Sequence, residues 1–160
     1  MAISIFARID TIEGESSDAR HKGEIDVLSW SWGVSHSGAV GRGAGGGAGR
    51  ASFHDFSFTH HVDKASPILM KACSTGQHIK DATITVRKAG EGQQDYLIIT
   101  MTDLLVTSVS TSVSAEGDTT MEGVTLAFAK VDLEYKPQEP DGALAVGIHF
   151  KYDFRAHKEV

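Results

Sequence analysis

Alternation between apolar and polar side chains, with a period of two residues, runs through most of the chain. Apolar residues take every second position in 3–9, 28–34, 82–87 and 146–154. Successive side chains of a strand point to opposite faces, so each stretch predicts a strand with one apolar face. Phe56 and Phe58 mark a further strand, with His54 and His60 on the same side, and the nearly continuous apolar run YLIIT (96–100) predicts a buried one.

Two tryptophans, Trp30 and Trp32, lie two residues apart in the segment EIDVLSWSWG (24–33). In an extended chain both indoles lie on one face, together with Leu28 and Val34. This much apolar surface has to be buried in a core or against another chain. The segment leads into residues 37–50, which hold seven of the 17 glycines. Because glycine loses the most conformational freedom on ordering, this loop is either mobile or ordered by a neighbouring molecule.

The apolar positions change parity within 124–135. They are even-numbered up to Phe128 and odd-numbered from Val131 onward. Such a slip predicts a β-bulge or a sharp coil of the strand near Ala129, as at the corner of a barrel.

Residues 66–76 predict one helix. Ser66 is a suitable N-cap and Gly76 a suitable C-terminal stop. The apolar face between them follows helical spacing and is formed by Leu69, Ala72 and Cys73.

Loops are predicted at 13–23, 37–50 and 113–123, with a turn at 137–142. Together the elements predict a mainly β protein, an antiparallel β-barrel or two-sheet sandwich with one flanking α-helix. A length of 160 residues predicts a single domain, 1–160.

The charge and composition of the chain limit the kinds of partner that it is expected to bind. The chain has 15 basic and 21 acidic residues, a formal net charge of −6, which argues against nucleic acid or an anionic membrane as the main partner. A lone cysteine rules out an intramolecular disulfide framework. No apolar run approaches the roughly 18 residues of a membrane span, and the N-terminus does not resemble a secretory signal. We therefore expect a protein made in the cytoplasm, without membrane insertion, whose export would need a dedicated machine.

No residue pattern matches a catalytic or metal motif. The glycine-rich loop lacks the Gly-Lys-Ser/Thr of a phosphate-binding loop. Cys73 with His78 as its base would form a nucleophile, but the helical pattern places Cys73 on the buried face, where a thiol behaves as a small apolar group. The sequence thus predicts no enzyme, no cofactor and no metal. Surface or strand-edge positions are favoured for the histidines that lack metal-ligand spacing: His36, His54, His60, His61 and His78.

Eight segments follow one another along the chain: EIDVLSWSWG, GRGAGGGAG, FSFT, LMKACSTGQH, RKAG, YLIIT, SVSTS and VTLAFAKVDLEYKPQ. Together they resemble the haemolysin-coregulated protein (Hcp) family, the tube proteins of bacterial type VI secretion. The resemblance extends from about Ile3 to Tyr152.

The resemblance implies a β-barrel that assembles into a homo-hexameric ring with a central channel. Rings of the family stack into a tube inside a contractile sheath, tipped by a spike protein, and contraction exports the tube without a cleaved signal peptide. The ring also shelters small effector proteins. Because this chain ends soon after its last predicted strand, we expect the plain tube subunit, without the C-terminal toxin domain of some relatives.

The resemblance also implies contact regions. The glycine loop would pack on the next ring, and the loop at 113–123 would contact a neighbouring subunit or ring. Ser110, Ser112 and Ser114 would border the channel, where cargo binds. The alternative for each is a solvated loop. The expected contact residues in and beside the glycine loop are Gly38, Arg42, Gly45, Gly46, Gly47 and Arg50.

Three other functions stay open at this point. One is a phage-like tail tube subunit, a hypothesis close to that of the type VI tube subunit. A secreted β-sandwich binding module would be a monomer or dimer with a ligand pocket, and a small hydrolase would lose activity on alanine substitution of Cys73 or a histidine.

Overall fold

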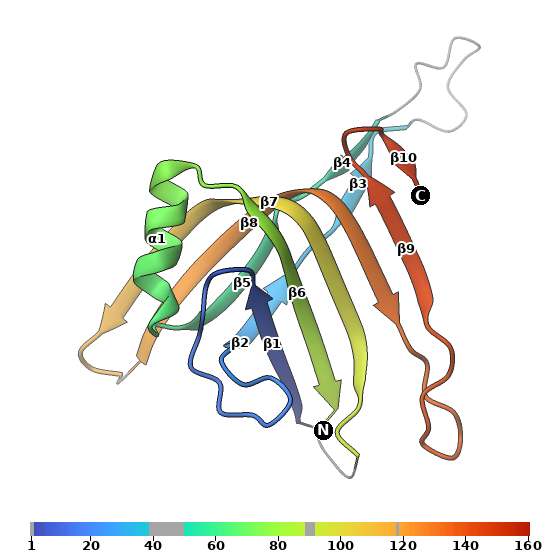
Figure 1. The fold of residues 1–160 in the computed structure, drawn as a ribbon, viewed down its shortest axis with the longest axis horizontal. Helices are drawn as coiled ribbons and strands as arrows, with labels where there is room; N and C mark the ends of the chain where they lie inside the picture. The colour runs from blue at the N-terminus through green and yellow to red at the C-terminus, as the bar shows by residue number, and fades with distance from the viewer. Residues whose placement is uncertain (1, 39–49, 89–91, 118) are drawn as a thin grey trace.

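The computed structural model describes residues 2–38, 50–88, 92–117 and 119–160, and these residues form ten strands and one helix (Figure 1). In chain order the elements are β1 (Ile3–Ile9), β2 (Ile25–Ser31), β3 (Val34–His36), β4 (Ala51–Phe53), β5 (Phe56–His61), α1 (Ala65–Thr75), β6 (Ile79–Lys88), β7 (Asp95–Ser114), β8 (Thr119–Tyr135), β9 (Ile148–Asp153) and β10 (Lys158–Glu159).

Six strands close into a barrel. Their order is β8-β5-β2-β1-β6-β7, every pairing is antiparallel, and β7 pairs again with β8 to complete the ring of strands. β9 and β10 continue the sheet outward from β8, and β3 and β4 form a separate hairpin. The mainly antiparallel β fold with one helix is confirmed, and of the barrel and the sandwich the structure has the barrel.

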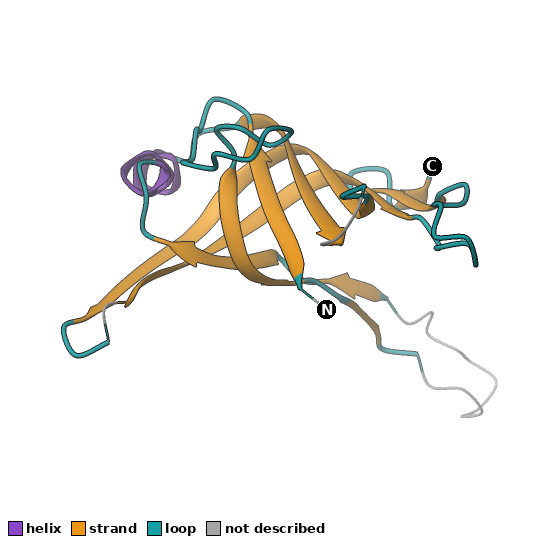
Figure 2. Cartoon of the chain, turned by 90° about the horizontal axis from the view of Figure 1, so that it is seen from below, coloured by secondary structure: helices purple, strands orange, loops and turns teal. Residues whose placement is uncertain are grey.

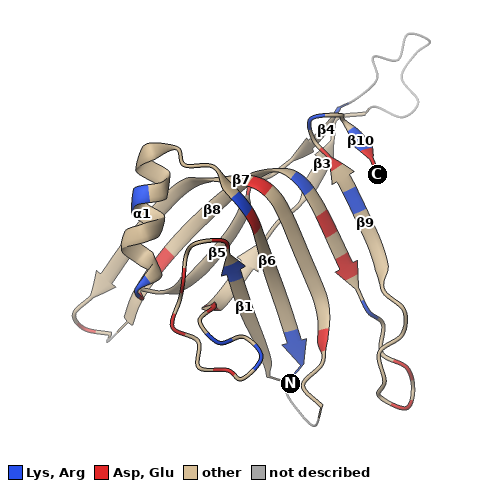
Figure 3. Ribbon diagram, viewed as in Figure 1, with Lys and Arg blue, Asp and Glu red and all other residues tan. Residues whose placement is uncertain are grey.

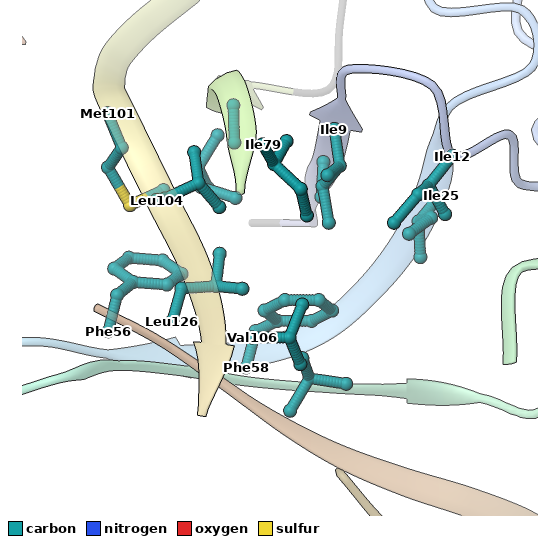
Figure 4. Close-up of a cluster of buried hydrophobic side chains, with 14 of the residues drawn as sticks. Ile9, Ile12, Ile25, Phe56, Phe58, Ile79, Met101, Leu104, Val106 and Leu126 are labelled. Atoms are coloured by element: carbon teal, nitrogen blue, oxygen red, sulfur yellow. The ribbon is translucent and has the colours of Figure 1, made fainter. Parts of the chain in front are cut away.

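The core fills this barrel and draws apolar side chains from all six of its strands (Figure 4). Phe56, Phe58 and Leu126 are fully buried in it, as are Ile84 and Ile99. Each such side chain contributes about 1.5–3 kcal/mol of transfer free energy on burial. The alternation of apolar and polar residues in β1, β5 and β6 therefore arises because each strand buries one face in the barrel core.

α1 lies on one flank of the barrel and packs Leu69 and Ala72 into the core (Figure 2). Gly76 ends the helix in the left-handed conformation, φ 65°, as predicted. Ser66 is not the N-cap, because the helix begins at Ala65. The Ser66 hydroxyl instead accepts the Asp63 N–H, and the Asp63 carboxylate accepts the N–H of Ala65, the first helical residue, so one free helix-end donor is satisfied.

The tryptophan strand differs from its prediction. β2 ends at Ser31, and its pairing with β5 shifts register between Val27 and Ser29. This irregularity turns Leu28 outward, where it is 45% exposed, while Trp30 packs against the core. Val34 belongs to the β3–β4 hairpin and is also exposed, so the four residues do not share a buried face.

The parity change in β8 is confirmed, but the bulge lies elsewhere. β8 pairs with β5 up to Leu126 and with β9 from Lys130 onward, so the strand changes neighbours where the buried side switches. The register shift itself is in β7, between Val106 and Ser108. Asp103 of β7, across from this corner, has φ 56°.

Two further predictions on strand extent were wrong. The expected loop at 113–123 is mostly strand, because β7 and β8 run on as a hairpin that extends well beyond the barrel (Figures 1 and 2). The last strand is shorter than expected, and its apolar face is not uniformly buried. Val146 lies before β9 and is 89% exposed, and Ile148 is 65% exposed.

Candidate functional site

Among the described strands, two open edges lie on opposite sides of one sheet. β1 pairs with β2 only over 25–27, so the edge of β2 from Leu28 to Ser31 faces no strand among the described residues. β6 pairs with β7 only up to Leu104, which leaves the outer edge of β7 from Leu105 to Ser114 equally open. The two edges bound one four-stranded sheet, β2-β5-β8-β7. Open edges carry unpaired N–H and C=O groups and are templates for strand pairing.

One face of this four-stranded sheet is covered by hydroxyl groups. Residues that pair directly across strands lie on the same face. The pairings give two rows of small residues across all four strands, Ser29–Thr59–Gly123–Ser110 and Ser31–Ser57–Thr125–Ser108, and Ser112 and Ser114 continue along β7. We call these residues the hydroxyl face.

The opposite face of the same sheet belongs to the barrel core. Trp30 pairs with Phe58, Phe58 with Val124, and Val124 with Val109, and all four side chains pack into the core or against it. The hydroxyl face therefore points directly away from the barrel.

Hydrogen bonds between neighbouring hydroxyls tie the hydroxyl face together. Ser29 Oγ lies 2.6 Å from Thr59 Oγ1, and Ser108 Oγ lies 2.7 Å from Thr125 Oγ1. A shallow pocket of about 110 Å³ opens between β2 and β5 and is lined by Ser29, Trp30, Ser31, Ser57, Phe58 and Thr59. β7 carries no charged side chain from Leu104 to Ser114, so this part of the strand is tan in Figure 3. The face offers many weak hydrogen-bonding groups and little charge.

The three serines named from the sequence lie on this surface. Ser110, Ser112 and Ser114 are exposed and occupy alternate positions of β7, so they share one face. The prediction missed the hydroxyls of β2 and β5, which continue the rows. Their signal is present in the sequence as serine and threonine alternating with the buried aromatics of SWS and FSFT.

Most of the glycine-loop prediction falls outside the described residues, including Arg42, Gly45, Gly46 and Gly47. Gly38 and Arg50 are described and stand at the two ends of the loop. The Ser37 hydroxyl accepts the Arg50 N–H at 3.2 Å, and Ser37 N–H donates to the Arg50 carbonyl at 3.3 Å, which closes the loop at its root.

An aromatic cluster holds the β3–β4 hairpin, which we call the arm, against the rest of the molecule. Phe53 of β4 packs at 4.8 Å from Tyr152 and 4.7 Å from Phe154, measured between ring centroids. Trp32 lies beside Phe53, and its indole N–H donates to the His54 carbonyl at 2.8 Å. Aromatic pairs of this kind add about 0.5–1.5 kcal/mol beyond area burial. The sequence placed these aromatics on separate strands and gave no signal that they meet.

A row of polar side chains crosses the core face of the sheet at the base of the β7–β8 hairpin. His60 Nε2 lies 2.9 Å from Glu122 Oε1, and Thr111 donates to Glu122 Oε2 at 2.7 Å. His60 is 0% exposed, so the prediction of a surface or strand-edge histidine was wrong for this residue. Asp63 lies 3.8 Å from the other His60 nitrogen, and burial raises the pKa of the Asp63 carboxyl.

A second charged cluster fixes the predicted loop at 13–23 to the barrel. Arg87 forms a forked pair with Asp18, at 3.0 Å and 2.5 Å, and lies over the ring of Phe6. Phe6 in turn stacks on His21, with the ring centroids 4.3 Å apart. The Arg87 guanidinium and the backbone N–H groups of Arg20 and His21 hold the pKa of Asp18 well below its usual range.

The positions of the described side chains give little support to a catalytic or metal-binding site. Cys73 is half-buried against the core and behaves as an apolar residue. His78 contacts Asp103 at 3.3 Å on the exposed side of the barrel. The described residues place no three His, Cys, Asp or Glu side chains where they would hold a metal ion. In the same residues, no helix has the length and apolar character needed to cross a membrane.

Comparison with known proteins agrees with this geometry. Residues 6–135 match the profile of the family described as "Type VI secretion system effector, Hcp". Protein hcp1 of Pseudomonas aeruginosa is 52% identical over 144 residues, 89% of each chain. The crystal structure of Hcp1 from Salmonella typhimurium is 40% identical, with a TM-score of 0.79 over 100% of both chains. A solved type six secretion system protein has a TM-score of 0.92 at 25% identity, over 99% of this chain and 100% of its own.

The profile match covers most of the chain, and the curated relative and the solved structures agree on the same family and fold. The resemblance drawn from the eight sequence segments is thereby confirmed. The chain belongs to the Hcp family and is a type VI secretion tube protein.

Proposed function

We propose that the chain builds the type VI inner tube from six-membered rings, joined through the two open edges of the β2-β5-β8-β7 sheet. The observation that carries this proposal is the pair of open edges at opposite sides of one sheet. Such an interface is head-to-tail, with two different surfaces meeting at each joint, and it closes when the rotation per subunit completes a circle.

The strand directions suit this pairing. β2, β5, β8 and β7 alternate in direction because each neighbouring pair is antiparallel. The β7 edge of one copy therefore meets the β2 edge of the next as an antiparallel pair. Antiparallel pairing requires no crossover and continues the alternation around the ring.

The hydroxyl face would line the channel. When the sheets join edge to edge, one sheet face turns inward and the other outward. The barrel core and α1 sit behind the face opposite the hydroxyls, and their bulk requires the wider outer circumference. Four strands from each of six copies, about 4.8 Å apart, give a circumference of about 115 Å and a backbone diameter of about 37 Å.

A channel wall of this chemistry suits passing cargo. Serine and threonine hydroxyls both donate and accept hydrogen bonds, so they adapt to many protein surfaces. Because the channel wall would carry little fixed charge, effector proteins of positive or negative net charge would both enter the channel. Ser110, Ser112 and Ser114 would contribute to this wall together with Ser29, Ser31, Ser57 and Thr59.

The arm and the glycine loop would form the contact between stacked rings. Glycine-rich segments lose much conformational freedom on docking, which makes each stacking contact weak. Weak stacking suits a tube that grows only where the spike protein and the surrounding sheath assemble it. Residues 38–50, with Arg42 and Arg50 as cations, would carry this contact.

Hydrogen–deuterium exchange tests the ring interface directly. Amides at 28–31 and at 105–114 should exchange slowly in assembled protein, and faster after dilution dissociates the rings. Amides of β1 and β6, which each already have two strand neighbours, serve as the internal control. Rings in which both edges exchange as fast as in the dissociated chain would contradict edge pairing.

A further inference from the structure

A pocket of about 180 Å³ opens where the arm joins the rest of the molecule. Phenylalanines from three separate segments form its apolar walls: Phe53 of β4, Phe128 of β8 and Phe154 just after β9. The lining is completed by His54, Asp55 and Ala127. Sites for cofactors and drug-sized ligands usually have volumes of about 300–1,000 Å³. The size of this pocket therefore suits a single amino-acid side chain rather than a nucleotide or a similar cofactor.

The three rings of the pocket are steeply inclined to one another. Phe154 meets Phe53 edge to face, with ring centroids 4.7 Å apart and an interplanar angle of 81°. The angle between Phe154 and Phe128 is 70°, at a centroid distance of 5.4 Å. Aromatic walls inclined in this way surround cationic groups in proteins, because the face of each ring carries partial negative charge.

Asp55 supplies the negative charge of the pocket, and one of its oxygens is held in place. The Thr107 hydroxyl donates to Asp55 Oδ2 at 2.8 Å. Thr125 Oγ1 lies 2.6 Å from Thr107 Oγ1 and 2.7 Å from Ser108 Oγ. A carboxylate only accepts hydrogen bonds, so Thr107 directs its one proton to Asp55. Thr125 then donates to Thr107, and Ser108 donates to Thr125. This chain of donors fixes the carboxylate at the end of the hydroxyl face.

The cations closest in sequence to the pocket walls are paired with other aspartates. Lys130 Nζ lies 3.9 Å from Asp153 Oδ2, and the Arg155 guanidinium lies 3.3 Å from Asp103 Oδ2. Within the part of the chain that the structure describes, Asp55 forms no ion pair. The Asp55 carboxylate therefore stands beside apolar rings with its charge unmatched.

The chemistry of the lining selects among side chains that could fill the pocket. An acidic side chain would be repelled by Asp55, and an apolar one would desolvate the carboxylate without compensation. A lysine or arginine side chain suits both parts, because its methylene stem packs on apolar surface while its charged end reaches a polar partner. Arginine suits it best, since a planar guanidinium stacks on aromatic rings and donates two hydrogen bonds to one carboxylate.

We propose that this pocket binds a single arginine or lysine side chain of another protein, with the cationic end on Asp55 and the stem between the three phenylalanines. Ala127 follows Thr125 on the same side of β8, so the pocket adjoins the hydroxyl face. The bound protein would be cargo carried along that face. This identification of the partner rests on the proposed function, whereas the selectivity of the pocket for a cation does not.

Titration of the purified full chain with N-acetylarginine methylamide tests the pocket, with the isotope-labelled methyl group of Ala127 observed by NMR. N-acetylcitrulline methylamide is the matched neutral probe, because its urea group has nearly the shape of a guanidinium without the charge. We expect a saturable shift with millimolar affinity for the arginine probe, and binding of the citrulline probe that is weaker by at least about threefold. Equal affinity for the two probes would overturn the selectivity for a cation, and no saturable shift with either would overturn the site.

The substitution Asp55→Asn removes the charge with little change in shape, because an amide oxygen still accepts the Thr107 hydroxyl. Its affinity for the arginine probe should fall by about three- to tenfold. Asp141→Asn is the matched control. It removes the same charge at the turn between β8 and β9, at the opposite end of β9 from Phe154, and should bind like the wild type. The same affinity in all three proteins would contradict the role of Asp55.

The substitution Phe154→Leu keeps an apolar side chain but removes the ring that is steeply inclined to both of the others. The ratio of arginine to citrulline affinity should fall by about two- to fivefold, because a leucine has no electron-rich face. A merely structural role of Phe154 would weaken both probes alike, and an unchanged ratio would contradict the aromatic part of the site. Should Phe154→Leu fail to fold, the comparison of Asp55→Asn with Asp141→Asn decides the matter.

The same titration separates the pocket from ring formation. Arginine-selective binding by a protein that forms no rings would count against the proposed function and leave the pocket standing. Rings that form normally but bind both probes alike would overturn the pocket and leave the proposed function standing.

Discussion

At the scale of single residues, buried charges fix backbone segments that apolar packing does not reach. The forked Arg87–Asp18 pair joins the 13–23 loop to β6, and its planar geometry on the ring of Phe6 adds a cation–π contact. Arg87 is almost fully buried, so its charge has to be matched locally. The sequence shows both residues but does not show that residues 69 positions apart pair.

Substitution of Asp18 by asparagine should destabilise the protein at neutral pH, and the destabilisation should begin to shrink at about pH 3. Because the folded pKa of Asp18 is depressed, its carboxylate contributes stability above the ordinary value of about 3.9, and this contribution is lost as pH falls. Urea unfolding of wild type and Asp18→Asn at about pH 7 and about pH 3 measures the difference. A gap between the two proteins that stays constant with pH would count against this role.

Two glycines offer a matched test of close backbone approach. A Cβ at Gly14 would lie 2.5 Å from the Glu24 carbonyl oxygen and 2.7 Å from Ile25 Cα, both rigid backbone atoms. A Cβ at Gly123 would meet nothing within 4 Å. We expect Gly14→Ala to cost about 1–3 kcal/mol of unfolding free energy and Gly123→Ala to be close to neutral. Equal stability of the two variants would show that the Gly14 crossing is loose.

At the scale of elements, the periodicity of apolar residues predicts most strands, because barrel strands each bury one face. The periodicity fails to predict the structure where the pairing of a strand with its neighbours is irregular. Leu28 is turned outward at the irregularity beside Val27, and the β7 bulge at Thr107 moves the core-facing side from the even position Val106 to the odd position Val109. The hairpin at 113–123 was interpreted as a loop because its serines and threonines face no core on either side.

The candidate site was predicted in part for a related reason. Ser110, Ser112 and Ser114 stand out as an alternating run, whereas Ser29 and Ser57 are interleaved with aromatics that dominate the pattern. That they form one face depends on strand pairing between distant segments. His60 could not be identified as buried, since histidine alternating with phenylalanine fits either an exposed or a buried side.

The aromatic cluster at the base of the arm predicts a local effect. Phe53→Ala should cost about 1–2 kcal/mol overall. It should also release β3 and β4, raising amide exchange in 34–36 and 51–53 while the barrel strands stay protected. Tyr135→Ala, which removes a half-exposed aromatic from an edge-to-face pair with Tyr96, is the control and should leave the arm unchanged. Exchange that rises equally in both variants would show that Phe53 does not anchor the arm.

At the scale of the whole molecule, the barrel supplies stability and the sheet that runs beyond it supplies surfaces for assembly. The closed barrel leaves no edges of its own, and the two edges proposed for ring formation arise from the extensions of β2 and β7. In the proposed ring, strand pairing would give directional contacts, and the hydroxyl face would leave the inner wall hydrated and weakly charged. A core for folding and separate edges for association would allow rings to form without remodelling the subunit.

The most direct test of this account is the native mass of the purified protein, combined with negative-stain images of the same fraction. The account predicts particles of six 17.1 kDa chains, seen as rings with an open centre, whose wall is about 37 Å across the backbone for untilted strands and wider when the strands tilt. A stable monomer from micromolar to millimolar concentration, with no rings in the images, would contradict self-assembly through the open edges.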